Sequence, residues 1–305
     1  MKKNSAPYFI IILLLGSAYY AYDSGLLDQF LTPEEPDEPI TPPSGDDIKI
    51  AGFNIQIFGR TKREKEQVMN VLANTVREFD VVLVQEIRDS SETTAPIFLD
   101  RINNMEGPEY AFIRSERLGR SSSKEAYAYF YNTETVEYLI DSAFVYNDTD
   151  DVFEREPYVA SFTSGGFDFT LIGIHTKPDD AYHEIGNLTI VFDYVEGLGD
   201  ERDVIALGDF NADGSYFDED SMDNPLKAPE YIWVVGNDWD TMTKTDWTYD
   251  RMVMTNYTYS SEYITETIQV YYYDTIYGLN QTLTESVSDH YPIYAEFSTS
   301  LPDDD

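Results

Sequence analysis

The sequence predicts an α/β fold in which mixed β-sheets are covered by helices. Strand-like and helical segments occur in irregular order between residues 48 and 298, and several strand-like segments are close enough to form hairpins. The 305 residues are 42% hydrophobic and 15% aromatic, which is sufficient for a packed core. Because this stretch shows no internal boundary or repeat, we expect a single domain of about 250 residues.

The periodicity of apolar residues locates the individual elements. Residues 47–58 alternate like a strand, residues 62–79 have apolar side chains at helical spacing, and residues 80–87 form a short apolar run typical of a buried strand. The helical stripe consists of Val68, Leu72, Val76 and Phe79. Further strands are predicted at residues 126–131, 158–163, 167–175 and 203–210, and a second helix at residues 181–198.

Three segments lie outside this predicted domain. Residues 1–22 contain two lysines, a short apolar stretch and small residues, which is the layout of an export signal. If it is not cleaved, the stretch is marginal as a membrane anchor, and a buried helix of the domain is the remaining alternative. Residues 23–47 are a proline-rich acidic linker, and residues 299–305 are an acidic tail. We therefore expect an extracellular protein, secreted or anchored to the outer face of the membrane, with membrane contact only through residues 1–22.

The composition restricts the classes of function. The net charge is −37, which argues against a protein that binds nucleic acid by bulk electrostatic attraction. The charge fits a high-salt environment, where the Debye length is about 3 Å at 1 M, or an exported protein with exposed acidic segments. There are no cysteines, so disulfides, zinc–thiolate sites and a lipidated cysteine are excluded.

Polar side chains stand at one end of four predicted strands. They are Glu86, His175, Asp209 with Asn211, and Asp289 with His290. A surface loop explains any one of them, but together they include two of the three histidines in the chain. Because α/β enzymes place reactive groups in strand-terminal loops, the sequence predicts a shared site.

The residue types at these strand ends indicate a particular chemistry. Carboxylate and amide oxygens suit Mg²⁺, Mn²⁺ or Ca²⁺. Two histidines supply general acid and base near neutral pH, and neighbouring carboxylates fix their tautomers. This combination fits phosphodiester hydrolysis by water. The chain has no glycine-rich phosphate-binding loop, so nucleotide binding of that type is not supported.

Eight segments in order carry a resemblance to a known family. They are KIAGFNIQIFG, VVLVQEIRDS, SERLGRSSSKEAY, FEREPYVASF, IGIHTKP, LGDFNADGSY, YDRMVM and SDHYP. The chain resembles deoxyribonuclease I within the endonuclease/exonuclease/phosphatase superfamily, across nearly all of residues 48–297. The resemblance implies a four-layer α/β sandwich, with two mixed β-sheets packed face to face and flanked by helices. It also implies a DNA substrate, and we expect a monomer.

The resemblance implies a metal site and a phosphate site at the strand ends. Glu86, helped by Asn54 and Asp289, would hold a catalytic Mg²⁺ or Mn²⁺ ion. Asp209 and Asn211 would position the phosphate, the attacking water or a second metal.

Two histidine–carboxylate pairs are also implied by the resemblance. His175 would pair with Glu125, and His290 with Asp250. The pairs would act as general acid and general base around the scissile phosphate, and the sequence leaves open which histidine has which role. His183 matches no motif and is expected at the surface.

Two arginines are implied as DNA contacts, and two other contacts of the family are changed. Arg88 would enter the minor groove and Arg155 would contact a backbone phosphate. Gln56 stands where the family has an arginine, and Ser123 where it has a tyrosine, which weakens the expected grip on DNA. The family's long disulfide would join positions 214 and 247, and we expect Trp247 to pack over Gly214 instead.

Structural calcium is a further implication of the resemblance. One loop offers the carboxylates of Asp151 and Glu156 and the carbonyl of Phe153, with Asp148 as a fourth ligand. Oxygen donors at alternate positions suit Ca²⁺. In a second, shorter loop the candidate ligands are Asp240, Thr243 and Thr245, and a solvated acidic loop is the alternative there.

The positive charges of the chain are clustered rather than spread evenly. The first group is Arg60, Lys62, Arg63 and Lys65, and the second is Arg114, Arg117, Arg120 and Lys124. They form either a basic rim around the site or ordinary solvated faces.

Three functions follow from these observations. The first is an exported or membrane-anchored, metal-dependent endonuclease that hydrolyses DNA with low sequence specificity and leaves 5′-phosphate ends. The second is a superfamily phosphoesterase with another substrate, of the sphingomyelinase or phosphoinositide phosphatase type. The third is a surface binding protein without catalysis. The complete set of candidate catalytic residues favours an enzyme.

Overall fold

The computed structural model describes residues 47–120, 123–199 and 202–301.

The first of two β-sheets contains the longest strand of the domain. The strands of this sheet are β1 (Ile48–Phe58), β2 (Val81–Ile87), β3 (Tyr110–Arg114), β4 (Ala126–Asn132), β12 (Gln269–Val270) and β13 (Ile293–Phe297). Their order is β12-β13-β1-β2-β4-β3. The sheet is mixed, because β1 pairs in parallel with β2 and antiparallel with β13.

The second sheet is also mixed and carries the central part of the chain. Its strands are β5 (Glu137–Tyr138), β6 (Phe144–Val145), β7 (Tyr158–Ser164), β8 (Phe167–Gly173), β9 (Val204–Asp209), β10 (Tyr231–Trp233) and β11 (Asp250–Thr255). The order is β10-β11-β9-β8-β7-β5, and β6 pairs with β7. Strands β8 and β9 are parallel, whereas β7–β8 and β9–β11 are antiparallel.

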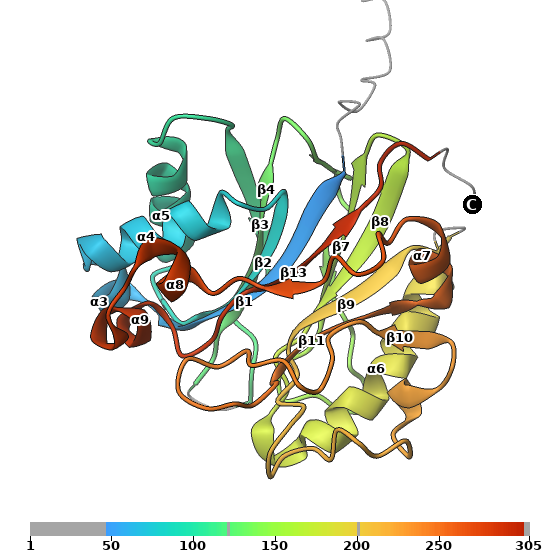
Figure 1. Ribbon diagram of the computed structural model, residues 1–305. Coiled ribbons are helices and arrows are strands. Elements are labelled where there is room, and N and C mark those ends of the chain that lie inside the picture. The colour runs from blue at the N-terminus through green and yellow to red at the C-terminus, as the bar shows by residue number, and fades with distance from the viewer. Residues whose placement is uncertain (1–46, 121–122, 200–201, 302–305) are drawn as a thin grey trace, which may run out of the picture. The chain divides into compact units, whose positions relative to one another are not determined.

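Helices cover the outer faces of both sheets. They are α3 (Arg60–Arg63), α4 (Glu66–Val76), α5 (Thr94–Asn103), α6 (Ala181–Glu196), α7 (Asn256–Ser261), α8 (Tyr273–Tyr277) and α9 (Gln281–Val287), with 3-10 turns η1 (Pro178–Asp180) and η2 (Pro225–Lys227). Figure 1 shows α4 and α5 beside the first sheet and α6 beside the second. The predicted four-layer sandwich is therefore confirmed.

The helix predicted at residues 62–79 is divided in the structure. A short helix, α3, ends at Arg63, and α4 begins at Glu66 after Lys65, whose backbone is extended. The apolar stripe lies in α4, and Phe79 follows the helix but is still buried. The pattern located the buried face correctly, because burial depends on spacing. It did not show the break, because Lys62 and Lys65 have good helix propensity.

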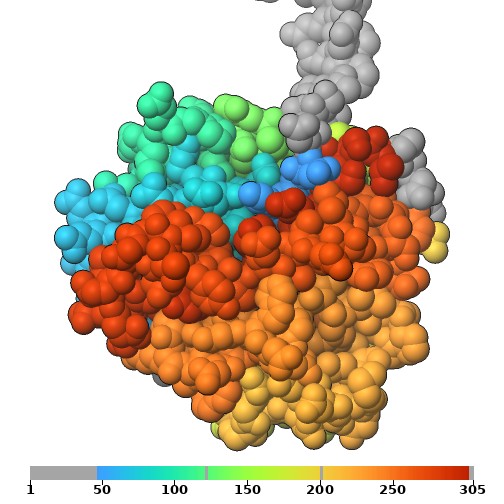
Figure 2. Space-filling view, viewed as in Figure 1, coloured from blue at the N-terminus to red at the C-terminus, as the bar shows by residue number. Residues whose placement is uncertain are grey.

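Apolar side chains fill the space between the sheets and the space under α6. The larger cluster includes Phe53, Leu83 and Leu207 from both sheets, and the smaller one joins α6 to the outer face of the second sheet. The sheets approach closely at Gly52, where an added Cβ would lie 3.5 Å from the backbone nitrogen of Gly208. Figure 2 shows the later part of the chain, coloured orange and red, over the face in view.

The strand ends that carry the candidate site residues lie at one edge of the packed sheets. Asn54 of β1 is in register with Gln85 of β2, and Gly173 of β8 with Leu207 of β9. Parallel neighbours end on the same side of a sheet, so the polar residues that follow these positions are brought together.

The ends of the chain are only partly described. Residues 1–22 and nearly all of residues 23–47 lie outside the described residues, as does most of the predicted acidic tail. Thr299 is buried, and its carbonyl accepts a hydrogen bond from Gly166, so the packed body continues past residue 298. Within the described part of the chain, none of the helices has the length and apolar character that a membrane span needs.

Candidate active site

Unusual backbone conformations surround the candidate site. Gln56, Ile57, Glu86 and Asn211 all have positive φ angles, of 26°, 51°, 60° and 48°. Non-glycine residues rarely adopt this region, and such strain clusters at functional sites. Two of the four are residues that the sequence placed in the site. The pairing of β1 with β2 shifts register between Asn54 and Phe58, so a bulge turns the end of β1 toward the site.

Gly208 allows the second sheet to deliver Asp209. Its φ is +134°, and an added Cβ would lie 2.3 Å from the carbonyl oxygen of Ile174, so only glycine fits this position. The neighbouring amide of Gln85 accepts from the backbone N–H of Asp209 at 3.0 Å and donates to the Ile174 carbonyl at 2.5 Å. Gln85 of the first sheet therefore fixes the ends of β8 and β9 in the second.

His175 and Glu125 form the first predicted pair. His175 Nδ1 lies 2.7 Å from Glu125 Oε1, and both side chains are buried. Burial alone would lower the pKa of His175, but Glu125 and Asp209 raise it above the ordinary value, against the opposing charge of Arg155. For Glu125 burial favours a raised pKa, but His175, Arg155 and Arg88 lower it. An ionised carboxylate therefore supports a protonated imidazole.

His290 and Asp250 form the second predicted pair. His290 Nδ1 lies 2.8 Å from Asp250 Oδ2, and both residues are buried. Burial lowers the pKa of His290, but the carboxylates of Asp250, Asp209 and Asp289 raise it to about 10. The Ser288 hydroxyl accepts from the His290 backbone N–H at 3.1 Å and donates to the Asn54 carbonyl at 2.6 Å, which ties this loop to β1.

Asp209 lies between the two pairs. Its Oδ2 is 3.3 Å from His175 Nε2 and 3.5 Å from His290 Nε2, and it accepts from Asn54 Nδ2 at 3.0 Å. Burial would raise the pKa of Asp209, but the two histidines lower it. Asn211 donates its backbone N–H to Asp209 Oδ1 at 3.0 Å. Both imidazoles thus direct Nε2 to one point, as two groups that act on one phosphate must.

Two of the predicted metal ligands, Asn54 and Glu86, are in contact, and the third, Asp289, is tied to the end of β1 through Gln56. Asn54 Nδ2 is 3.4 Å from Glu86 Oε1, and Gln56 Nε2 donates to Asp289 Oδ2 at 2.7 Å. Asp289 Oδ1 is buried and accepts no hydrogen bond within the described residues. A buried carboxylate oxygen without a donor is costly unless a cation completes it. The oxygen donors present therefore fit a divalent cation such as Mg²⁺ or Mn²⁺.

A second set of candidate ligands overlaps with the first. Glu86, Glu125 and His175 each offer one ligand atom, and these three atoms lie within 4.8 Å of one another. Glu125, however, already contacts His175 and has Arg155 and Arg88 at 3.7 Å and 3.4 Å. Arg88 lies even closer to Glu86, at 3.1 Å, so it does not separate the two carboxylates. Because Glu125 is fully buried and its Oε1 already holds His175 Nδ1, we favour Glu86 with Asn54 and Asp289 as the cation site.

The two arginines predicted to contact DNA differ in burial. Arg88 is partly exposed, and its guanidinium lies 3.1 Å from Glu86 and 3.4 Å from Glu125. Arg155 is buried and donates to the carbonyls of His175 at 2.9 Å and Thr176 at 2.7 Å. Arg155 thus fixes the backbone of a catalytic candidate, and its predicted contact with a phosphate stays a prediction.

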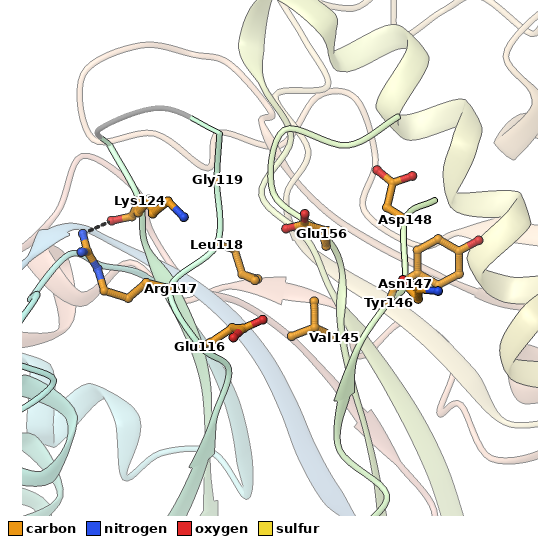
Figure 3. Close-up of a pocket in the computed structure, with 10 residues that line it drawn as sticks. All are labelled: Glu116, Arg117, Leu118, Gly119, Lys124, Val145, Tyr146, Asn147, Asp148 and Glu156. Carbon is orange, nitrogen blue, oxygen red and sulfur yellow. Dashed lines mark hydrogen bonds between the residues drawn. The ribbon is translucent and has the colours of Figure 1, made fainter. Parts of the chain in front are cut away.

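The guanidinium of Arg120 lies among the candidate ligands of the first predicted calcium loop. Arg120 contacts Asp151 at 2.8 Å and also donates to the Phe153 carbonyl at 2.5 Å. Asp148 accepts from the backbone N–H of Phe153 at 2.8 Å. Figure 3 shows Asp148 and Glu156 on one wall of a cavity of about 420 Å³, opposite residues 116–119 and Lys124. These residues fit Ca²⁺ only if the guanidinium moves away.

The second predicted calcium loop fits a cation better. Burial, with Asp246 and Asp274 nearby, raises the pKa of Asp240. The buried hydroxyl of Thr245 has no hydrogen-bond partner among the described residues. The loop also supports the active site, because Thr243 donates its backbone N–H to the Asp289 carbonyl at 2.8 Å. Concentrated negative charge and an unpaired hydroxyl match the oxygen ligands that Ca²⁺ requires.

Three of the eight cations in the two predicted basic groups, Arg63, Arg114 and Arg120, form ion pairs with acids within the described residues. Arg63 pairs with Asp89 at 2.9 Å, and Arg114 with Glu92 at 2.5 Å. Lys62 is buried rather than exposed, so these groups do not form a continuous basic rim.

The sequence did not single out Gln85 and Lys62 as members of the site. Gln85 could have been found in the sequence, because it is a polar amide directly before Glu86 in an otherwise apolar strand. Lys62 donates to the carbonyls of Ile55 and Val287 at 3.0 Å and 2.8 Å, which a sequence pattern could not show. His183 is exposed, as expected, and Trp247 packs at 3.3 Å from the position of a Cβ on Gly214.

The fold and the paired histidines define a member of a phosphoester-cleaving class. Residues 51–290 match the Endonuclease/Exonuclease/phosphatase family, and the chain belongs to this family. Within it, the chain is a deoxyribonuclease I-like member. It is 33% identical to deoxyribonuclease-1 of Equus caballus over 81% of this chain and 90% of the relative. It is 35% identical to deoxyribonuclease-1-like 1 of Homo sapiens over 83% and 85%.

Solved structures support the fold. A protein of the same family from Bacteroides vulgatus has a TM-score of 0.59 and 14% identity, over 83% of this chain and 99% of that one. A family protein from Leptotrichia buccalis has a TM-score of 0.58 and 16% identity, over 82% and 99%.

Proposed function

We propose that this protein is an exported or membrane-anchored, divalent-metal-dependent endonuclease that hydrolyses DNA with low sequence specificity. The observation that carries the proposal is the convergence of His175 Nε2 and His290 Nε2 on Asp209, beside Glu86. Relatives at 33% and 35% identity, a deoxyribonuclease-1 and a deoxyribonuclease-1-like protein, support DNA as the substrate.

The two pairs supply the proton transfers of hydrolysis. Water attacks the phosphorus, and the bond from phosphorus to the 3′ oxygen breaks, so that a 5′-phosphate end remains. One imidazole, in its neutral form, takes the proton of the water, while the other, in its protonated form, gives a proton to the leaving oxygen. Glu125 and Asp250 hold Nδ1 of each ring, so Nε2 faces the substrate.

The remaining groups bind and orient the phosphate. A divalent cation held by Glu86, Asn54 and Asp289 would offset the charge that develops on the phosphoryl oxygens. Asn211 is held by two hydrogen bonds. Its backbone N–H donates to Asp209 at 3.0 Å, and its side-chain amide donates to the Thr176 carbonyl at 3.1 Å. Contacts to the phosphate and metal carry no base information, which is why low sequence specificity is proposed.

One observation favours a second candidate function. Because Arg63, Arg114 and Arg120 are paired with acids, the two basic groups offer less free positive charge to a polyanion than the sequence indicates. A superfamily phosphoesterase that acts on a smaller substrate, such as sphingomyelin or a phosphoinositide, has less need of that charge.

The test compares substrates with the full-length protein. Supercoiled plasmid, sphingomyelin vesicles and a phosphoinositide are each incubated with Mg²⁺ and Ca²⁺, with and without chelator. We expect nicked plasmid with 5′-phosphate ends, lost on chelation, and no lipid turnover. Lipid hydrolysis with intact plasmid would support the second candidate, and no turnover on any phosphoester would support a binding protein. Detection of the mature N-terminus in cell fractions tests export.

A further inference from the structure

Ile57 combines a strained backbone with an exposed apolar side chain at the edge of the active site. Its φ is +51°, a region that β-branched residues avoid because Cβ lies too close to the backbone. The side chain is 57% exposed, so it contributes little to the core. Glycine or asparagine would adopt this backbone with less strain. Packing within the protein therefore does not account for an isoleucine here.

The backbone of Ile57 is held by the catalytic centre. Its N–H donates to Glu86 Oε2 at 2.7 Å, and the preceding residue, Gln56, bonds to Asp289. These contacts explain why the chain takes the strained conformation, but they use only the main chain of Ile57. The exposed side chain of Ile57 is thereby fixed directly beside Glu86, where the sugars next to a bound phosphate would lie.

A cavity of about 400 Å³ adjoins Ile57 and contains lysines. Its lining includes Ile57, Lys65 and Lys244. Lys65 is exposed and makes no ion pair within the described residues, whereas Lys244 pairs with Glu285 at 2.9 Å. On a chain of net charge −37, an unpaired ammonium group beside the active site is a distinctive feature.

We propose that Ile57 is a substrate-binding residue that packs against a sugar or base of the DNA strand next to the scissile phosphate, while Lys65 contacts a flanking phosphate. The inference rests on the proposed nuclease function. Apolar side chains serve this purpose in nucleic-acid complexes, because sugars and base faces offer apolar surface. The strain at Ile57 is then retained for binding rather than for stability.

Three variants of the full-length protein separate binding from folding. Ile57→Asn accepts a positive φ but is polar, and we expect its KM for duplex DNA to rise about tenfold while its Tm equals or exceeds that of wild type. Ile57→Leu keeps an apolar side chain at this position and is expected to keep KM within about twofold of wild type. Lys65→Ala should reduce the slope of log KM against log salt concentration by about one.

A small chromogenic phosphodiester serves as the second substrate. We expect Ile57→Asn to lose much more activity on DNA than on this compound, because the compound does not reach the proposed contact. A wild-type KM for DNA in Ile57→Asn, or equal losses on both substrates with a lower Tm, would overturn the inference and leave the nuclease function standing. If wild type cleaves the small phosphodiester but not DNA, the proposed function and this inference both fail.

Discussion

At the scale of single residues, His290 shows how burial and charge compete. Three carboxylates outweigh desolvation and raise the pKa of its imidazole to about 10. The charged form therefore contributes stability that is fully present below the ordinary pKa of about 6.5 and is lost as the pH rises through about 10.

We predict that His290 of the metal-free protein titrates well above 6.5 and that Asp250→Asn lowers its pKa, because Asp250 is the carboxylate that raises this pKa most. NMR of histidine-labelled protein in chelator measures both. Urea unfolding should show falling stability between pH 7 and 10. Titration of wild-type His290 at or below 6.5 would contradict the account.

The apolar pattern placed His175 and His290 at strand ends, whereas their partners Glu125 and Asp250 were implied only by the resemblance to a known family. The partners of the arginines could not be predicted in this way. Arg155 and Arg120 have long side chains whose contacts depend on how loops from different parts of the chain pack. The structure buries Arg155 against His175 and directs Arg120 at Asp151.

At the scale of elements, Lys62 of α3 connects two segments that carry site residues. Its ammonium group joins the carbonyl of Ile55 in β1 to that of Val287 in α9. Burial lowers the pKa of Lys62 to about 8, although Asp289 and Glu86 oppose the shift.

We predict that Lys62→Met lowers the free energy of unfolding by about 1–3 kcal/mol, because two buried carbonyls lose their donor. Lys65→Met, three positions along the chain and exposed, should stay within about 0.5 kcal/mol of wild type. Urea denaturation of both variants provides the comparison. Equal stabilities would show that Lys62 is not a link between β1 and α9.

The loop that contains Asp240 and Thr245 is predicted to bind the structural calcium. Adding Ca²⁺ to chelated protein should raise Tm by several degrees, because a ligand that binds only the folded state stabilises it. Asp240→Asn should remove most of this shift. Asp148→Asn should leave it in place, because Arg120 already occupies the other loop. The reverse pattern in thermal melts would move the calcium to residues 148–156.

The layers of the fold were predictable because apolar periodicity determines which faces are buried. The break between α3 and α4 was not, since Lys65, where the backbone becomes extended, has good helix propensity. The sequence also did not show which of the two predicted calcium loops fits a cation better. It follows from an unpaired hydroxyl at Thr245 and a guanidinium at Arg120, and both are properties of the packed structure.

At the scale of the whole molecule, the net charge of −37 opposes folding and DNA binding together. We predict that Tm rises with NaCl from low to molar concentration, because salt screens repulsion among acidic side chains. The KM for DNA should rise over the same range, since each phosphate contact weakens with salt. Thermal melts and nicking assays in one salt series test both. A Tm that falls with NaCl would show that charge repulsion is not a major destabilising force.

The most direct test of the account is a plasmid-nicking comparison of His175→Ala, His290→Ala and the double variant in the full-length protein. If both pairs act on one phosphate, each single variant should lose about 10²–10⁴-fold in rate, and the double variant should lose little more. Circular dichroism establishes that each variant is folded. A folded single variant that nicks plasmid at a rate close to wild type would contradict the shared active site.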